Sequence, residues 1–121
     1  MRKKILIVDD EPNIVKLLGY RLTYNKYDVL KAYSGLECLS LARSYTPDLI
    51  LLDIQMPKCD GISTFNKLFL DDRTREIPVL FMTSFTREYS ETHLLNLGAK
   101  GFISKPINCE DLRTHINIIL N

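Results

Sequence analysis

The stretch "KKILIVDDEPNIV", residues 3–15, decides the fold class of this chain. It begins with an apolar run rich in isoleucine and valine, which is typical of a strand buried on both faces of a parallel sheet. Asp9 and Asp10 follow that run directly, and Pro12 then suits the first turn of a helix. The stretch therefore predicts a buried strand that passes through an acidic turn into a helix.

The same alternation of strand and helix continues along the chain. We expect further strands at about residues 27–33, 48–53, 77–83 and 101–104, and helices at about 34–45, 62–70, 86–97 and 108–121. Ser34 with Glu37, and Asn108 with Asp111, have the spacing of helix caps. Five strand–helix units in series predict a doubly wound α/β fold, a parallel sheet with helices on both faces.

Composition limits the function classes. The chain has 121 residues, of which 45% are hydrophobic, so residues 1–121 fit one domain with a core of its own. The net charge of +1 gives no overall basic field for nucleic acid or an anionic membrane. Because we find no export signal or membrane-length apolar run, we expect a soluble cytoplasmic protein. The three cysteines lack CxxC spacing and indicate reduced thiols, not zinc ligands.

Polar side chains stand at four of the five predicted strand ends. The ends in question carry Asp9 with Asp10, Asp53, Thr83 with Ser84, and Ser104 with Lys105. The second strand, which ends at Tyr33, has no comparable group. If the strand order is 2-1-3-4-5, the second strand lies at the edge and the other ends border the crevice where open α/β sheets bind ligands. The pattern predicts a polar site there.

The acidic cluster requires a positive partner. Three converging carboxylates repel one another, and without compensation at least one holds a proton at neutral pH. Lys105 is one candidate; a divalent cation is the stronger one, and oxygen ligands without a histidine or cysteine cluster favour Mg²⁺ or Mn²⁺. Mg²⁺ commonly takes few protein carboxylates, which leaves one free as a nucleophile. A hydroxyl and an ammonium opposite would complete a cage that fits a phosphoryl group.

Four motifs carry a resemblance to a known family over almost the whole chain. "ILIVDDEP" (5–12), "PDLILLDIQMPKCDG" (47–61), "VLFMTSF" (79–85) and "GAKGFISKP" (98–106) resemble, in order and spacing, the receiver domain of bacterial two-component response regulators. The resemblance implies a flavodoxin-like (βα)5 sandwich similar to the chemotaxis response regulator. It also implies a phosphorelay switch without metabolic activity, either a single-domain regulator or a piece of a longer protein.

The resemblance also implies roles for individual residues. Asp53 would accept a phosphoryl group from a sensor histidine kinase or a histidine phosphotransfer protein. Asp9, Asp10, Asp53 and the backbone carbonyl of Gln55 would bind Mg²⁺. Thr83 and Lys105 would bind the phosphoryl group, Thr83 and Phe102 would act as the switch pair, and Lys105–Pro106 would be a cis peptide. Gln55 and Phe85 would tune the rate at which water reaches the acyl phosphate.

The switch would change a surface formed by the fourth helix, the fifth strand and the fifth helix. Tyr89, His93, Lys100 and Arg113 lie in these segments, and we expect this face to bind an output partner or form a phosphorylation-enhanced dimer. Because Phe102 lacks a phenolic hydroxyl, we expect its inward rotamer to be populated before phosphorylation. His93 and His115 are expected to be structural or surface residues.

Other interpretations stay open on the residues alone. Each polar strand end has an ordinary explanation as a turn, a helix cap or a solvated lysine. A flavin or nucleotide binder would need a Gly-rich or Ser/Thr-rich phosphate loop after the first strand, where "DDEPN" stands instead. An aspartate-nucleophile phosphatase would carry a second acid two residues after Asp53, where this chain has Gln55. A degenerate receiver used only for binding is disfavoured because no key group is missing.

Overall fold

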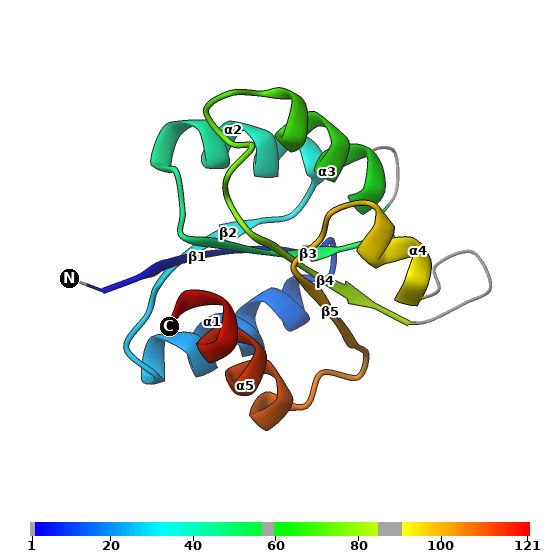
Figure 1. The fold of residues 1–121 in the computed structure, drawn as a ribbon. Helices are drawn as coiled ribbons and strands as arrows, with labels where there is room; N and C mark the ends of the chain where they lie inside the picture. The colour runs from blue at the N-terminus through cyan, green and yellow to red at the C-terminus, as the bar shows by residue number, and fades with distance from the viewer. Residues whose placement is uncertain (1, 57–59, 85–90) are drawn as a thin grey trace.

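A computed structural model describes residues 2–56, 60–84 and 91–121. Within these residues five strands alternate with five helices (Figure 1). The elements are β1 (Lys4–Val8), α1 (Pro12–Tyr24), β2 (Asp28–Ala32), α2 (Gly35–Tyr45), β3 (Leu49–Asp53), α3 (Gly61–Leu70), β4 (Val79–Thr83), α4 (Glu91–Asn96), β5 (Gly101–Ser104) and α5 (Cys109–Leu120). The predicted alternation is confirmed.

The five strands form one parallel sheet in the order β2-β1-β3-β4-β5, as predicted. The chain therefore reverses direction of winding between β1 and β3, which are neighbours in the sheet. Helices α1 and α5 cover one face of the sheet, and α2 and α3 cover the other (Figure 1). The carboxyl ends of β1 and β3 consequently open side by side at one edge, where such folds bind their ligands.

The inner strands β1, β3 and β4 are largely apolar because each contributes to two cores. Leu6 and Val8 of β1 belong to the core under α2 and α3, which also includes Phe65. Ile5 and Ile7 point to the opposite face and join the core under α1 and α5. Successive strand side chains point to opposite faces, so a sheet covered on both sides requires a continuous apolar run.

The helix caps confirm the signals in the sequence. Ser34 Oγ accepts a hydrogen bond of 3.1 Å from the Glu37 backbone N–H, and the Glu37 carboxylate accepts one of 2.9 Å from Tyr33 N–H. Asn108 Oδ1 accepts from the backbone N–H groups of Glu110 and Asp111, at 2.9 and 3.1 Å. These contacts satisfy N–H groups that have no partner inside the helix.

The structure differs from the prediction mainly at element ends. The fourth strand begins at Val79 and not at Ile77, because Pro78 has no N–H to donate to the ladder. Helix α4 is described from Glu91, so the expected start near Thr86 lies outside the described residues, as do Cys59, Phe85 and Tyr89. Among the described helices, none combines the length and the apolar character needed to cross a membrane.

Candidate functional site

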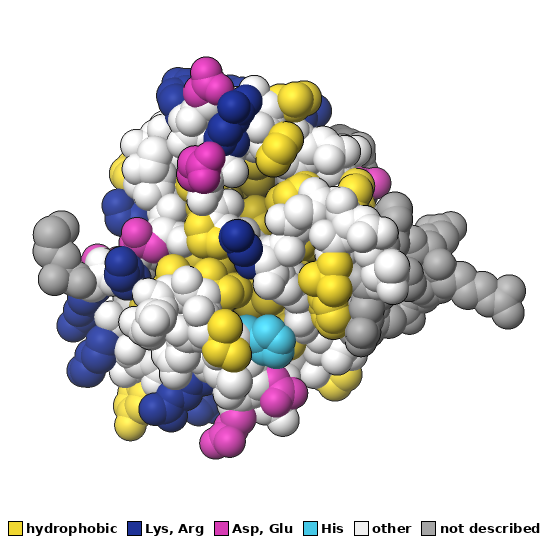
Figure 2. All heavy atoms as spheres, in the orientation of Figure 1, with side chains coloured by type: hydrophobic (Ala, Val, Ile, Leu, Met, Phe, Trp, Pro, Cys, Tyr) yellow, Lys and Arg dark blue, Asp and Glu magenta, His cyan; other side chains and the backbone are white. Residues whose placement is uncertain are grey.

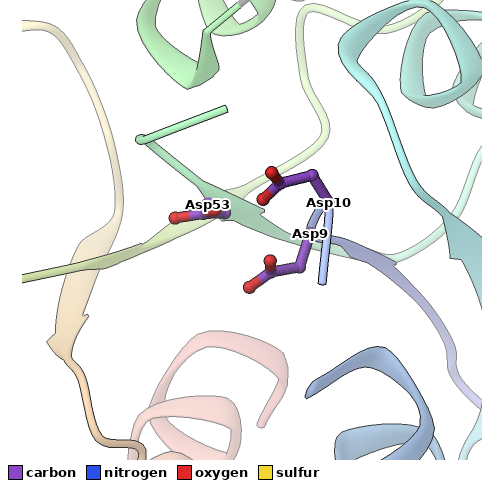
Figure 3. A group of neighbouring side chains, drawn as sticks. All are labelled: Asp9, Asp10 and Asp53. Atoms are coloured by element: carbon purple, nitrogen blue, oxygen red, sulfur yellow. The ribbon is translucent and has the colours of Figure 1, made fainter. Parts of the chain in front are cut away.

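Three aspartates meet at the carboxyl ends of β1 and β3 (Figure 3). One carboxylate oxygen from each of Asp9, Asp10 and Asp53 lies within 4.8 Å of the others. Asp9 and Asp53 are 0% and 1% exposed, whereas Asp10 is exposed. Asp9 is fixed by the turn that starts α1, because its Oδ1 accepts a hydrogen bond of 3.0 Å from Glu11 N–H. The predicted convergence of carboxylates is therefore present.

The ammonium of Lys105 lies between the two buried carboxylates. Its Nζ is 3.0 Å from Asp9 Oδ2 and 3.2 Å from Asp53 Oδ1. The lysine directly follows β5, and its backbone N–H donates a hydrogen bond of 2.8 Å to the carbonyl of Thr83. The Lys105–Pro106 peptide bond is cis. In the described structure Lys105 thus supplies positive charge to the acidic cluster, although one ammonium faces three carboxylates.

The surroundings of Asp53 disfavour its ionised form. Burial, followed by the charge of Asp9, raises the pKa of Asp53 from 3.8 to about 6, although Lys105 and the Gln55 N–H oppose the shift. Burial acts to lower the pKa of Lys105, but its contacts with Asp9 and Asp53 outweigh burial and leave that pKa raised. The pocket therefore favours additional positive charge next to Asp53, since that would stabilise the ionised carboxylate.

Thr83 adds a hydroxyl that has no partner among the described residues. Its Oγ1 is buried and makes no hydrogen bond to any described residue. Thr83 is the last residue of β4, and it pairs in register with Ser104 of β5, directly before Lys105. A buried hydroxyl without a partner is costly, so this group is ready to donate to an acceptor that enters the site.

The donor set fits a hard divalent cation. It consists only of oxygen atoms, and its charge is not neutralised by Lys105 alone. Asp9, Asp10 and Asp53 are the carboxylates that could hold such an ion. Gln55, the fourth predicted ligand, is exposed next to the cluster, and its N–H donates a hydrogen bond of 3.3 Å to Asp53 Oδ1.

Apart from Thr83, the residues predicted for the switch and its output surface do not belong to the group of three aspartates. Phe102 is half-buried and packs against the core under α2 and α3. Lys100 and Arg113 are exposed, while the side chain of His93 falls outside the described part of the chain. His115 Nδ1 lies 2.7 Å from the carbonyl oxygen of Asp111 on its own helix, as expected of a residue outside the site.

Gly61 is a supporting residue that sequence reasoning missed. Its N–H donates to the Ile54 carbonyl at 2.9 Å, which brings the first turn of α3 against the end of β3. A Cβ atom on Gly61 would collide with the carbonyl oxygen of Asp53 and lie 2.6 Å from Ile54 Cα. The Asp60–Gly61 dipeptide is turn chemistry, so its signal was present, but the close approach is visible only in three dimensions.

Comparison with known families decides what this site belongs to. Residues 5–117 match the response regulator receiver domain. The chain belongs to this family. The receiver domain is 39% identical over 120 residues to the alkaline phosphatase synthesis transcriptional regulatory protein PhoP of Bacillus subtilis, covering 99% of this chain and 49% of PhoP. It is 38% identical over 108 residues to the polar-differentiation response regulator DivK of Brucella anthropi, covering 89% of this chain and 88% of DivK.

Solved structures agree with this assignment. The chemotaxis protein CheY4 of Vibrio cholerae superimposes with a TM-score of 0.90 at 27% identity, over 98% of this receiver domain and 99% of that chain. The chain spans about half the length of PhoP and of RpaA, a DNA-binding regulator of Synechocystis. Receiver domains of response regulators are signalling switches that interact with histidine kinases and phosphotransfer proteins.

Proposed function

We propose that Asp53 accepts the phosphoryl group and that residues 1–121 form one receiver domain. The observation that carries the proposal is the environment of this carboxylate. It is buried at a strand end, its pKa is raised to about 6, and it faces the Lys105 ammonium. Thr83 contributes a buried hydroxyl in the same edge of the sheet, without a partner among the described residues.

Asp53 suits the role of nucleophile better than its neighbours. Both oxygens of Asp9 are engaged, Oδ1 with Glu11 N–H and Oδ2 with Lys105 Nζ. Within the described residues, the contacts of Asp53 all go to Oδ1. Asp10 is exposed, where water stabilises its charge and lowers its reactivity. The remaining oxygen of Asp53 is thus the least committed buried nucleophile of the three.

The chain's own groups define the transfer step. Asp53 attacks the phosphorus of a phosphohistidine in line, so that a P–O bond forms while the P–N bond breaks and its electron pair leaves with the imidazole. Lys105 then exchanges part of its pairing with Asp53 for the phosphoryl oxygens, and Thr83 donates its hydroxyl to one of them. Asp9, Asp10, Asp53 and the Gln55 carbonyl would hold Mg²⁺, which would supply neutralisation of the charge that develops during the transfer. The domain thereby assists its own modification.

Labelling with a small acyl phosphate tests this assignment. We expect labelling only when Mg²⁺ or Mn²⁺ is present, because the acidic cluster requires a cation. Asp53→Asn should abolish labelling, whereas the matched exposed control Asp28→Asn should label normally. Single-site labelling that persists in Asp53→Asn would contradict the assignment. Wild-type Mg²⁺ affinity of Asp10→Ala, measured by calorimetry, would remove Asp10 from the metal site.

We assign the response to phosphorylation to the face formed by α4, β5 and α5. Figure 2 shows apolar side chains gathered on this side of the molecule, where Leu95 is 52% and Ile118 is 76% exposed. Movement of Thr83 toward the phosphoryl group would vacate space that the half-buried ring of Phe102 can fill. This face would then bind an output partner or a second copy, with a coupling of about 1 to 3 kcal/mol.

Amide exchange with and without a phosphoryl mimic tests this coupling. We expect changes in α4, β5 and α5, and we expect Thr83→Ala to keep labelling at Asp53 while losing those changes. Changes confined to α1 would reject the coupling and leave the phosphorylation proposal intact.

A further inference from the structure

A pocket of about 400 Å³ lies at the amino ends of β4 and β5. Its lining comes from α3, from the loop that leads into β4 and from the turn between α4 and β5 (Figure 1). The three aspartates of the acidic cluster lie at the carboxyl ends of β1 and β3. Because all five strands are parallel, the pocket is at the opposite end of the sheet from that cluster.

Two aromatic side chains of α3 line the pocket. Phe65 is 6% exposed and belongs to the core, whereas Phe69, one turn later on the same helix, is 58% exposed and belongs to neither core. Gly98 lies across from Phe65 with a φ of +102°, which favours glycine, and a Cβ atom there would lie 3.8 Å from Phe65 Cζ. The turn before β5 therefore approaches Phe65 without placing a side chain over its ring.

Charged groups from two segments also line the pocket. Lys100 is exposed and forms no ion pair with a carboxylate of the described residues. Arg75 Nη2 is 3.2 Å from Asp72 Oδ1, but the Asp72 side chain is 91% exposed, so this pair is weak and leaves other N–H donors of the guanidinium free to bind. Glu76 adds one carboxylate. The pocket thus combines an aromatic wall with two cations and one acceptor.

We propose that this pocket binds a nucleoside monophosphate. The base would stack on Phe69, and the phosphate would pair with Arg75 and Lys100. Glu76 would accept hydrogen bonds from the ribose hydroxyls or from an amino group of the base. The volume lies within the range of small-molecule sites. A simple aromatic carboxylate would also satisfy the cations, but it would offer Glu76 no donor.

The position of Lys100 gives such binding a consequence. Lys100 directly precedes β5, and its N–H donates a hydrogen bond of 3.0 Å to the Val79 carbonyl. It also belongs to the face assigned to the phosphorylation response, so a ligand that engages its ammonium would withhold that group from a partner there. This consequence rests on the proposed function, whereas binding in the pocket does not depend on the role of Asp53.

Titration of the isotope-labelled 121-residue chain with adenosine 5′-monophosphate, followed by NMR, tests the proposal. Divalent cations are left out, so that the acidic cluster repels the phosphate. We expect saturable shifts in residues 75–79 and 98–101. Affinity should fall roughly tenfold in Lys100→Ala, through loss of a charge-assisted contact, and by a similar factor in Phe69→Ala, through loss of stacking.

Two matched variants control for general effects of charge and surface. Lys67→Ala removes an exposed lysine of α3, and Leu70→Ala removes the 76% exposed side chain next to Phe69. Neither residue lines the pocket, so both variants should bind with unchanged affinity. Losses equal to those in Lys100→Ala and Phe69→Ala would overturn the proposal. So would the absence of saturable shifts, or shifts centred on the acidic cluster.

Related ligands separate a nucleotide site from simpler ones. Adenosine and inorganic phosphate should each bind at least tenfold more weakly than the nucleotide, because each makes only part of the contacts. Equal binding of inorganic phosphate would show an adventitious ion only. Equal binding of adenosine, or of 2-naphthoate, would show that the phosphate or the ribose is not recognised. Each of these results would overturn the proposal.

Discussion

Two aspartates, one at the end of β3 and one directly after α3, contact cations at similar distances, yet their pKa values shift in opposite directions. Asp53 lies 3.2 Å from Lys105 Nζ, and its pKa is raised to about 6. Asp71 lies 2.7 Å from Arg43 Nε, and its pKa is lowered to about 2, chiefly through hydrogen bonds from Arg73 and Arg43. Contact with a cation does not by itself decide the state of a carboxylate.

The surroundings account for the difference. Asp53 is enclosed at the end of β3 and shares its cation with Asp9, so burial and like charge outweigh the ion pair. Asp71 caps the end of α3 near solvent, and it receives the Arg73 backbone N–H at 2.9 Å as well as two guanidinium contacts. The first arrangement leaves unmet demand for positive charge, whereas the second satisfies a carboxylate completely. This incomplete compensation of charge supports the proposal that Asp53 is the phosphoryl acceptor.

The largest expected effect follows removal of the shared cation. Lys105→Met should destabilise the domain by about 3 kcal/mol at neutral pH, because two buried carboxylates lose their counter-charge. The loss should shrink as pH falls and Asp53 takes up a proton. Urea unfolding at several pH values measures it, and Lys67→Met is the exposed control. A loss independent of pH would show that Lys105 acts through packing. Added Mg²⁺ should stabilise the variant more than the wild type.

Neutralising the Asp53 carboxylate should have the opposite effect on stability and make the domain more stable. Because the folded pKa of about 6 lies above the ordinary value of 3.8, ionised Asp53 destabilises the fold, and stability falls as pH rises between these values. Asp53→Asn should therefore stabilise the metal-free domain by about 2 kcal/mol above pH 6 and not below pH 4. Paired urea titrations at the two pH values measure the difference. An equal gain in stability at both pH values would show that the effect does not come from ionisation of Asp53.

The unpartnered hydroxyl should have a smaller effect. Thr83→Val keeps the shape of the side chain but removes a buried hydroxyl without a described partner, so it should stabilise the domain by about 1 kcal/mol. Thermal unfolding measures the change. Because the same hydroxyl is proposed to bind the phosphoryl group, the variant should also lose its response to a phosphoryl mimic. Destabilisation by the substitution would indicate that Thr83 already has a partner.

The smallest effect is expected at the satisfied carboxylate. Asp71→Asn should weaken the domain slightly, through lost contacts with Arg43 and Arg73 that solvent partly replaces. Since the folded pKa is lowered to about 2, this contribution is present above the unfolded value of 3.8 and is lost as pH falls through about 2. Urea unfolding of both proteins at neutral and acid pH measures it. A loss of stability larger than in Lys105→Met would contradict the comparison of the two carboxylates.

The sequence predicted the strand order and the convergence of Asp9, Asp10 and Asp53, because parallel strands bring their carboxyl ends to one edge. Periodicity cannot assign burial to neighbouring residues after a strand, so it did not separate buried Asp9 from exposed Asp10. Nor could spacing show that the Lys105 ammonium lies between two carboxylates. That contact joins residues 96 positions apart and depends on side-chain conformation.

The close approach of the Lys31 side chain to Gly19 could not be predicted either, because the glycine lies on α1 and the lysine on β2. Sequence patterns identify which residue types reach an edge or a face. They do not identify the long-range contact that a missing side chain permits.

The close approach of Gly61 to the end of β3 has a consequence for directed evolution of this domain. Any side chain at position 61 would push on the main chain of Asp53 itself, and no rotamer can relieve a clash with backbone atoms. A saturation library there should return glycine, whereas exposed Ser63, two residues further along α3, should accept many residues. To adapt the site to a new phosphoryl donor, the side chains around the Asp53 carboxylate can be varied. Gly61, at the start of α3, cannot be replaced without displacing the backbone of β3.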